Sequence, residues 1–385
     1  MFSFFYNRFS NMQRLFKPHH KSVFFISFLL ILLLSACQAQ TLEFKTVQLA
    51  DDLQHPWSLA FLSPQQVLVT ERNGKLLKIN LVNGARTEVS GLPEIRAKGQ
   101  GGLLDVVLHP DYAKNGWIYF SYAGPGDAGI STEVGRAKLQ GNQLTEWQTL
   151  FRLLPKTNRG HHFGSRLVFD RQGYLFITTG DRGQRHRSQK LDDHAGSVIR
   201  LHDDGRIPAD NPFVNDATAY PEIFSYGHRN PQGAALHPVS GKLWIHEHGP
   251  QGGDELNIID KGKNYGWPVI SYGEEYGTDI PVGEGTAKPG MEQPLYYWVP
   301  SIAPSGMMFY QGERFPQWQG NLFIGSLKFR LLVRLELDGE KVVSEERLLR
   351  DELGRIRDVR MGPDGFIYLL TDAASGGLYR LEPGN

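Results

Sequence analysis

The sequence predicts an all-β fold, a six-bladed β-propeller with four-stranded antiparallel blades. One pattern recurs six times: a turn with Gly or a polar residue, then a short apolar run rich in β-forming residues. The copies begin at residues 65, 116, 173, 241, 320 and 365. Most copies are followed by a second apolar strand that contains a basic residue. Repeats of this period and content are typical of propeller blades, so six copies predict six blades around one axis.

The first predicted strand, residues 41–53, has no blade of its own. We expect it to pair with the C-terminal repeat, because closing the ring removes an exposed edge strand. Two long intervals between repeats contain insertions, residues 203–219 and 271–292, which are polar and rich in Gly, Pro and Asp. Loops of this length in a compact domain are more often functional than idle.

Residues 1–36 read as a signal peptide and residues 37–385 as the propeller domain. The basic flank carries Arg8, Arg14, Lys17 and Lys21 and no acidic residue. The apolar run 23–34 is too short to span ~30 Å of hydrocarbon. The following Leu-Ser-Ala-Cys resembles a bacterial lipobox, which predicts a lipidated Cys37. Ordinary cleavage after Ala36 or Ala39 is the alternative, and Met12 is a second possible start.

This leader predicts an exported protein on the periplasmic side of a Gram-negative bacterium, anchored to the outer membrane only through lipid. Cys37 is the only cysteine, so the propeller has no disulfide, no Cys nucleophile and no thiolate metal site. Without residues 1–36 the chain has 37 basic against 41 acidic residues, and no basic stripe predicts nucleic-acid binding. We expect a monomer or weak dimer.

Polar residues gather in the loops between repeats, and the first two such loops contain candidate catalytic groups. In residues 99–105, three glycines within four residues let the backbone approach a neighbour closely, and Gln100 lies among them. Residues 160–166 contain the pair His161 and His162, which cannot both point the same way along an extended segment. Histidine suits a general base at neutral pH, and Asp181, one strand later, is placed to orient it. A surface or core histidine is the alternative reading.

Later loops add cations and oxygen ligands. Arg229 and Asn230 precede a proline that restricts the local backbone, and Arg suits carboxylate binding. Residues 246–255 contain a His-x-His, but the surrounding carboxylates and carbonyls favour a hard cation such as Ca²⁺. Lys328, Arg355 and Arg357 lie where loops enter or leave a repeat. Each of these could be a surface charge, yet four cations that converge without acidic partners imply an anionic ligand.

Taken together, these segments resemble the soluble quinoprotein aldose dehydrogenases of the glucose/sorbosone dehydrogenase family. The matching stretches run in order through the propeller domain: residues 55–61, 99–105, 162–166, 226–233, 248–250, 253–257, 261–268 and 355–358. The resemblance implies a six-bladed propeller that binds pyrroloquinoline quinone (PQQ) and Ca²⁺ at one end of its axis.

The resemblance also implies residue roles. His162 would be the base and Asp181 the carboxylate that orients it. PQQ would be contacted by Gln100, Arg229, Asn230, Tyr276, Lys328, Arg355 and Arg357. Carbonyl oxygens of Gly249 and Pro250 would hold the Ca²⁺ that polarises the quinone, and Glu255 and Tyr265 match a second, structural Ca²⁺ site.

The implied reaction is oxidation of the C1 hydroxyl of an aldose to a lactone, with electrons passed to an external acceptor such as a quinone or cytochrome. Two departures stand out. His161 occupies a position where glucose-oxidising relatives have Asp, so sugar preference does not carry over. The aromatic residue that stacks on PQQ in some relatives is not matched near residues 299–301.

Two other classes of function stay open. A Ca²⁺-dependent, lactonase-type propeller hydrolase would need carboxylates and Asn around one axial ion, and it has no use for four converging cations. A non-catalytic propeller that binds a partner would not need His162 and Lys328 at matching positions.

Overall fold

The computed structural model describes residues 43–384. The predicted signal peptide and Cys37 lie outside this range, as does the start of the predicted strand 41–53. Within residues 43–384, no helix is long and apolar enough to cross a bilayer.

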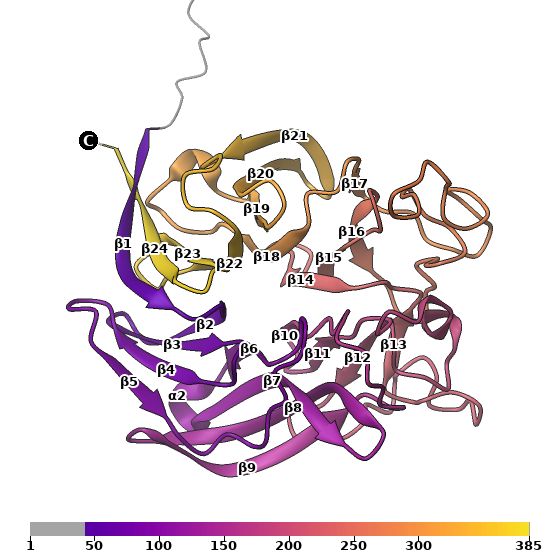
Figure 1. Cartoon of the computed structure of the whole chain (residues 1–385), viewed down its shortest axis with the longest axis horizontal. Helices are drawn as coiled ribbons and strands as arrows, with labels where there is room; N and C mark the ends of the chain where they lie inside the picture. The colour runs from indigo at the N-terminus through magenta and orange to yellow at the C-terminus, as the bar shows by residue number, and fades with distance from the viewer. Residues whose placement is uncertain (1–42, 385) are drawn as a thin grey trace, which may run out of the picture. The chain divides into compact units, whose positions relative to one another are not determined.

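The described chain forms six four-stranded antiparallel sheets arranged as a ring, which confirms the predicted propeller (Figure 1). Blades 1 to 3 are β2 (Pro56–Ser63), β3 (Gln66–Glu71), β4 (Leu76–Asn80), β5 (Arg86–Val89); β6 (Leu103–Leu108), β7 (Trp117–Gly126), β8 (Gly129–Gln140), β9 (Gln143–Arg152); and β10 (Leu167–Phe169), β11 (Leu175–Thr178), β12 (Ser197–Leu201), β13 (Ile223–Tyr226). Blades 4 to 6 are β14 (Pro231–Leu236), β15 (Leu243–Glu247), β16 (Asp254–Ile259), β17 (Tyr296–Trp298); β18 (Pro304–Phe309), β19 (Leu322–Ser326), β20 (Leu331–Asp338), β21 (Lys341–Leu348); and β22 (Ile356–Met361), β23 (Ile367–Thr371), β24 (Gly376–Pro383), β1 (Phe44–Leu53). Within residues 43–384, the connections contain the helix α2 (Tyr112–Asn115) and the 3₁₀ turns η1 (Arg185–Gln189) and η2 (Pro316–Trp318).

The six copies of the repeat are the second strands of the six blades, and the apolar runs that follow them are third strands. The second strands of blades 3 to 6 are buried on both faces, since each blade packs against two neighbours. Their sequences are therefore continuous apolar runs rather than alternating ones. This burial explains why the second strands give the strongest repeat signal in the sequence.

Ring closure follows the prediction. β1 pairs antiparallel with β24 as the outermost strand of blade 6, from Phe44 opposite Pro383 to Leu53 opposite Gly376 (Figure 1). Leu53 and Ala50 are buried with Leu59 and Val69 of blade 1 and Leu370 of blade 6. The first strand therefore joins the two ends of the ring both through its backbone and through a shared core.

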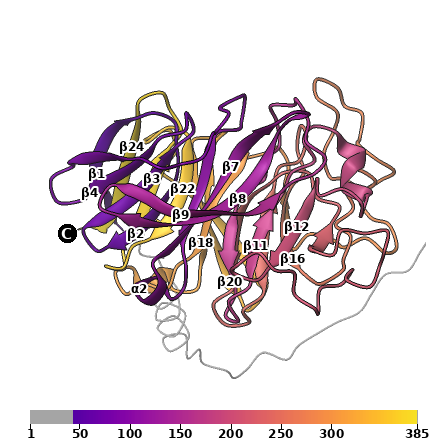
Figure 2. The ribbon, with the colours of Figure 1, turned by 90° about the horizontal axis from the view of Figure 1, so that it is seen from below.

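The antiparallel order of each blade brings two kinds of connection to the same end of the ring: the loop entering each first strand and the loop leaving each second strand. Figure 2 shows the ring turned by 90°, with β7, β8 and β9 of blade 2 side by side. We call this end of the axis the mouth. The predicted site residues lie in or beside its connections, except Tyr265 and Tyr276, which belong to the long connection between β16 and β17. That connection leaves a third strand at the opposite end of the ring and returns to the mouth, where the Trp267 main-chain N–H donates to the Gly227 carbonyl at 2.9 Å.

Candidate functional site

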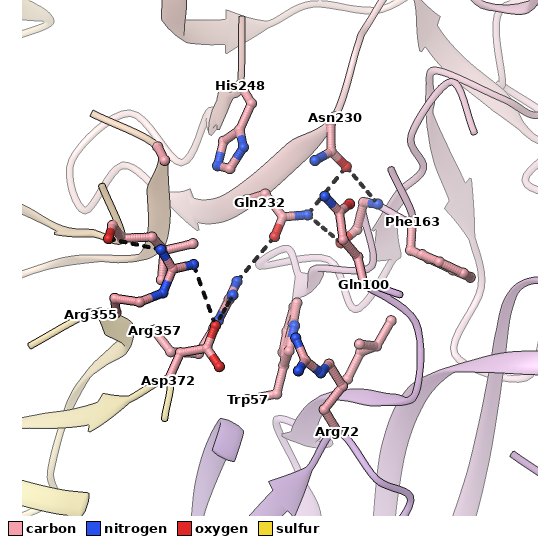
Figure 3. Close-up of a pocket in the computed structure, with 14 residues that line it drawn as sticks. Trp57, Arg72, Gln100, Phe163, Asn230, Gln232, His248, Arg355, Arg357 and Asp372 are labelled. Carbon is pink, nitrogen blue, oxygen red and sulfur yellow. Dashed lines mark hydrogen bonds and ion pairs between the residues drawn. The ribbon is translucent and has the colours of Figure 1, made fainter. Parts of the chain in front are cut away.

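A pocket at the mouth collects side chains from all six blades or the loops between them (Figure 3). It is lined by Trp57, Arg72, Gln100, Leu104, Phe163, Gly164, Asn230, Gln232, His248, Ala303, Leu327, Arg355, Arg357 and Asp372. In Figure 3, the polar ends of Gln100, Asn230, Gln232 and His248 lie on one side of this space, and those of Arg355, Arg357 and Asp372 on the other. Four of the predicted cofactor contacts, Gln100, Asn230, Arg355 and Arg357, are thus brought together.

His162 lies in the loop between β9 and β10, beside this pocket. Its Nδ1 is 2.6 Å from Oδ1 of Asp181, which follows β11 and is buried. Two further donors reach the same carboxylate: the Gly183 N–H at 2.7 Å and the Trp267 Nε1–H at 2.8 Å. The ionised carboxylate accepts from the ring Nδ1, so Nε2 is left free as the basic atom.

The loop that carries His162 is held in a strained conformation. His162 has a φ of 51°, in the left-handed region. The segment is therefore not the extended one along which neighbouring side chains were expected to point in opposite directions. The two rings nevertheless diverge: His161 is exposed, whereas His162 is half-buried against Asp181. The His162 main-chain N–H donates to Oε1 of Gln100 at 2.8 Å, which fixes the loop against the glycine-rich segment.

The glycines of residues 99–102 make the close approach that the sequence predicts, and the neighbour is this same loop. A Cβ on Gly99 would lie 2.3 Å from the Gly160 carbonyl oxygen, and one on Gly101 would lie 2.4 Å from the Phe163 ring. On the other side, a Cβ on Gly180 would lie 2.3 Å from the His162 carbonyl oxygen. Only glycine allows these contacts, so the backbone itself clamps the histidine loop.

Electrostatics favour a neutral His162. Burial lowers its pKa below the usual value, against the hydrogen bond to Asp181, and the nearby charge of Arg229 lowers it further. Burial raises the pKa of Asp181, but the effect of its polar neighbours is larger, and the pKa is lowered overall. These neighbours act through the hydrogen bond and charge of His162, the charge of Arg229 and the hydrogen bond from Trp267. The pair therefore combines a neutral imidazole with an ionised carboxylate.

The cationic side of the pocket differs from the sequence prediction, because it does contain an acidic partner. Asp372, which follows β23, accepts from Arg357 at 2.7 Å and lies 3.7 Å from Arg355 and 2.7 Å from Nδ1 of His55. The prediction that the cations converge without acidic partners is therefore wrong. Arg72 also lines the pocket, so three arginines face one carboxylate and the balance stays positive.

The remaining predicted cofactor contacts lie around this pocket rather than in its lining. Arg229 borders an adjoining pocket, and its guanidinium donates to the His248 carbonyl at 3.1 Å and contacts the Tyr276 hydroxyl at 3.4 Å. Tyr276 is 67% exposed, so in this structure its ring does not cover the pocket. Lys328 is also exposed, one residue beyond the lining residue Leu327.

The adjoining pocket contains most of the predicted metal ligands. It is lined by Arg229, Glu247, His248, Gly249, Gly253, Glu255, Tyr265, Trp267, Ile270 and Ser271, and Pro250 follows in the same buried loop. The Gly249 N–H donates to Asp254 at 2.8 Å, and a Cβ on Gly249 would lie 2.0 Å from the Gly252 carbonyl oxygen. The Tyr265 hydroxyl donates to the Ile258 carbonyl at 2.6 Å and accepts from the Asp260 N–H at 2.8 Å, so it is already engaged within the chain.

Two carboxylates face each other across this pocket. Burial, and then the charge of Glu247, raises the pKa of Glu255 to about 8. The Glu247 carboxylate is hydrogen-bonded to His228 at 2.8 Å. The Asn257 Nδ2–H donates to Glu255 at 3.2 Å, and the buried Asn257 Oδ1 has no partner in the described part of the chain. Within residues 43–384, no three His, Cys, Asp or Glu side chains form a metal cluster, so a cation here would depend on main-chain oxygens as well.

Comparison with known proteins identifies the family of this chain. A family model described as Glucose / Sorbosone dehydrogenase matches residues 53–380. The chain belongs to the glucose/sorbosone dehydrogenase family. The aldose sugar dehydrogenase YliI of Escherichia coli K12 is 48% identical over 372 residues, which cover 95% of this chain and all of the relative.

Solved structures agree with this membership of an oxidoreductase family. A crystal structure of the soluble aldose sugar dehydrogenase from Escherichia coli in the apo-form is 48% identical and has a TM-score of 0.86, covering 89% of this chain and 100% of that chain. The PQQ-bound aldose sugar dehydrogenase from Streptomyces coelicolor is 27% identical, with a TM-score of 0.72 over 89% of this chain and 100% of that one.

For this family member, sequence reasoning missed Asp372, Arg72, Gln232 and Trp267. Gln232 donates to Asn230 at 3.3 Å and accepts from Arg357 at 3.4 Å, so it links the two sides of the pocket. Both Gln232 and Trp267 lie inside motifs that the sequence singled out. Asp372 comes soon after the sixth repeat, as Asp181 comes soon after the third, and this approximate parallel is the signal that could have found it.

Asp372→Asn should lower the free energy of unfolding near pH 7 by about 1–3 kcal/mol, because buried Arg357 loses its charged acceptor. The charge and hydrogen bond of Arg357 outweigh burial and hold the pKa of Asp372 well below its usual value. A lowered carboxyl pKa stabilises the fold above about pH 4, and this stabilisation is lost as the pH falls. Denaturant unfolding from pH 7 to pH 3 should therefore show a smaller acid-induced loss in the variant.

The matched control is Asp351→Asn, because Asp351 and its partner Arg330 are both exposed. That variant should change stability by less than about 1 kcal/mol. Equal effects of the two substitutions would show that the Asp372 pair does not stabilise the mouth.

Proposed function

We propose that this protein oxidises the C1 hydroxyl of aldose sugars to lactones, using PQQ and Ca²⁺, and passes the electrons to an external acceptor such as a quinone or cytochrome. The observation that carries the proposal is the His162–Asp181 pair beside a pocket rich in arginine. The relatives named as aldose sugar dehydrogenases, one of them with PQQ bound, support the same activity.

The residues of the mouth fit PQQ. This molecule carries three carboxylates, and Arg355 and Arg357 line the pocket with Arg72 nearby. Buried Nε atoms of Arg229 and Arg357 have no hydrogen-bond partner within the described chain. Unpaired guanidinium donors of this kind suit an anionic ligand with planar carboxylates. Gln100 and Asn230 would add neutral contacts, and Lys328 and Tyr276 would contact the same molecule from the rim.

The adjoining pocket fits Ca²⁺. Carbonyl oxygens of Gly249 and Pro250, with the Glu255 carboxylate in the same pocket, are hard oxygen donors. Two facing carboxylates and an unpartnered amide oxygen are costly in a buried site that holds no cation. Gly249 and Pro250 would hold the ion beside the quinone, and Glu255 and Tyr265 would hold a structural one.

The chemistry of this chain's own residues follows from the His162 geometry. When bound, PQQ would supply the ortho-quinone that accepts the C1 hydride, and Ca²⁺ would make it more electrophilic. Nε2 of His162 accepts the proton from the anomeric hydroxyl as the hydride leaves C1. Asp181 holds the ring through Nδ1 and stabilises the imidazolium that forms. His161 is exposed one residue away and is placed to influence which sugar is accepted.

The test of the function is reconstitution. Purified protein stripped of metal is titrated with PQQ in the presence and absence of Ca²⁺, and oxidation of an aldose panel is followed with an artificial electron acceptor. Turnover should require both additions, and the sugar product should be a lactone. Oxidation that needs neither addition contradicts the proposal, and so does hydrolysis of lactones without any sugar oxidation.

His162→Ala should keep PQQ affinity and lose turnover by about 10²–10⁴-fold, which is the usual contribution of a general base. His161→Ala is the control, since it removes the same atoms one residue away at an exposed position. It should change the relative kcat/KM among sugars while keeping kcat on the best one. If His161→Ala abolishes turnover with every sugar while His162→Ala stays active, the assignment of the base is wrong.

We further propose that the protein is exported and held at the periplasmic face of the outer membrane by lipid on Cys37. The support is the basic flank, the short apolar run and the Leu-Ser-Ala-Cys sequence before the propeller. In a Gram-negative host, the full chain should fractionate with outer membranes, and Cys37→Ser should prevent lipidation. A mature N-terminal peptide that lacks acyl mass in the unsubstituted protein would contradict the anchor.

A further inference from the structure

The Asp181 carboxylate binds His162 through one oxygen and the indole of Trp267 through the other. Its Oδ1 is shared by His162 and the Gly183 N–H, whereas Oδ2 accepts within the described chain only from the Trp267 Nε1–H, at 2.8 Å. Asp181 is 1% exposed and Trp267 is 7% exposed. Without the indole donor, a buried carboxylate oxygen would be left unpaired, and the carboxylate could turn about its Cβ–Cγ bond.

Trp267 is held by hydrogen bonds to its main chain and by a guanidinium beside its ring. Its main-chain N–H donates to the Gly227 carbonyl at 2.9 Å, and its carbonyl accepts from Ser188 and Gln189, each at 2.7 Å. The Arg229 guanidinium lies 5.3 Å from the ring centroid, within cation–π range. The indole N–H therefore has a fixed direction, and it points at Asp181.

We propose that Trp267 is a positioning residue of the reaction: its indole N–H locks the Asp181 carboxylate so that His162 keeps its proton on Nδ1 and presents Nε2 to the sugar. This inference rests on the proposed function for its kinetic consequences only. An indole N–H donates and cannot accept, so it admits one orientation of the carboxylate and stabilises its ionised form. His162, Asp181 and Trp267 then form one chain from the mouth to the pocket that contains the predicted metal ligands.

The chain offers a matched control for this contact. Trp298, in β17 of the same blade, is equally buried, and its Nε1–H donates to the Glu345 carboxylate at 2.7 Å, outside either pocket of the mouth. Trp267→Phe and Trp298→Phe therefore remove the same atoms and the same kind of hydrogen bond. Only the first substitution reaches the base.

With the holoenzyme, Trp267→Phe should lower kcat by about 10- to 100-fold and leave KM within about twofold, because the loss concerns the orientation of the base. In a plot of kcat against pH, the acid limb should shift to higher pH by about one unit. An Asp181 carboxylate with one donor fewer attracts a proton on His162 more strongly. The other charged or titratable groups around this pair are retained in both variants: His161, Arg182, Arg185, Arg229 and His248. Trp298→Phe should match the unsubstituted enzyme in both readouts.

A second readout uses the apoprotein and needs no sugar oxidation. Nitrogen NMR of histidine-labelled protein should show a single neutral Nδ1–H tautomer for His162, and a mixture of tautomers in Trp267→Phe. In unsubstituted apoprotein, the Trp267 indole N–H signal should titrate with the same midpoint as His162, which tests the contact even if the variant does not fold.

Unchanged kcat and tautomer in Trp267→Phe overturn the inference. Equal losses of kcat in both variants would indicate a structural role and also overturn it. The same holds if the chemical shift of the Trp267 indole N–H does not change as His162 titrates. A protein that oxidises no sugar with PQQ and Ca²⁺ contradicts the proposed function, whereas the apoprotein measurements then still decide the role of Trp267.

Discussion

Closure of the ring is the constraint on which the pocket depends. The β1–β24 pairing holds blade 6 against blade 1, and at the mouth His55 of the first connection contacts Asp372 of the last blade at 2.7 Å. Near the axis, Arg360 of blade 6 binds Asp105 of blade 2 at 2.8 Å. Residues that are hundreds of positions apart thus share ion pairs, and the arginine side of the pocket keeps its shape only while both ends of the chain stay joined.

The charges near the axis divide into two layers. Beneath the pocket, the buried carboxylates Asp105 and Asp358 are matched by Arg166 and Arg360 at 2.8 to 3.3 Å, so this layer is close to neutral. At the mouth itself, Asp372 is the one carboxylate that lines the pocket, among three arginines. The lower layer thus pairs its buried charges, and the excess positive charge lies at the pocket, where a ligand can enter.

The fold was predictable because the second and third strand of each blade carry their signal locally, as a turn followed by an apolar run. His162 and the four predicted cations were singled out because they lie in loops at the strand ends of the repeats, and their roles were then inferred from the family resemblance. Asp372 and Trp267 were not predicted as site residues, because the contacts that give them a role are with residues distant in the sequence. Trp267 and Asp181, for example, are 86 residues apart. The left-handed backbone of His162 has no local signal either. It is imposed by contacts that Gly99, Gly101 and Gly180 permit from two other connections.

In a six-membered ring, blade 3 stands opposite blade 6, and this placement separates two tasks. Arg355, Arg357 and Asp372 enter from the blade 6 side, whereas His162 and Asp181 enter from the blade 3 side. Under the proposed function, a ligand held through its charge on one side would be presented to His162 on the other, without either group having to move. The separation also keeps Arg355 and Arg357 on the other side of the pocket from His162. Burial, and then the nearby charge of Arg229, lowers the pKa of His162, so the imidazole stays neutral while the pocket stays positive.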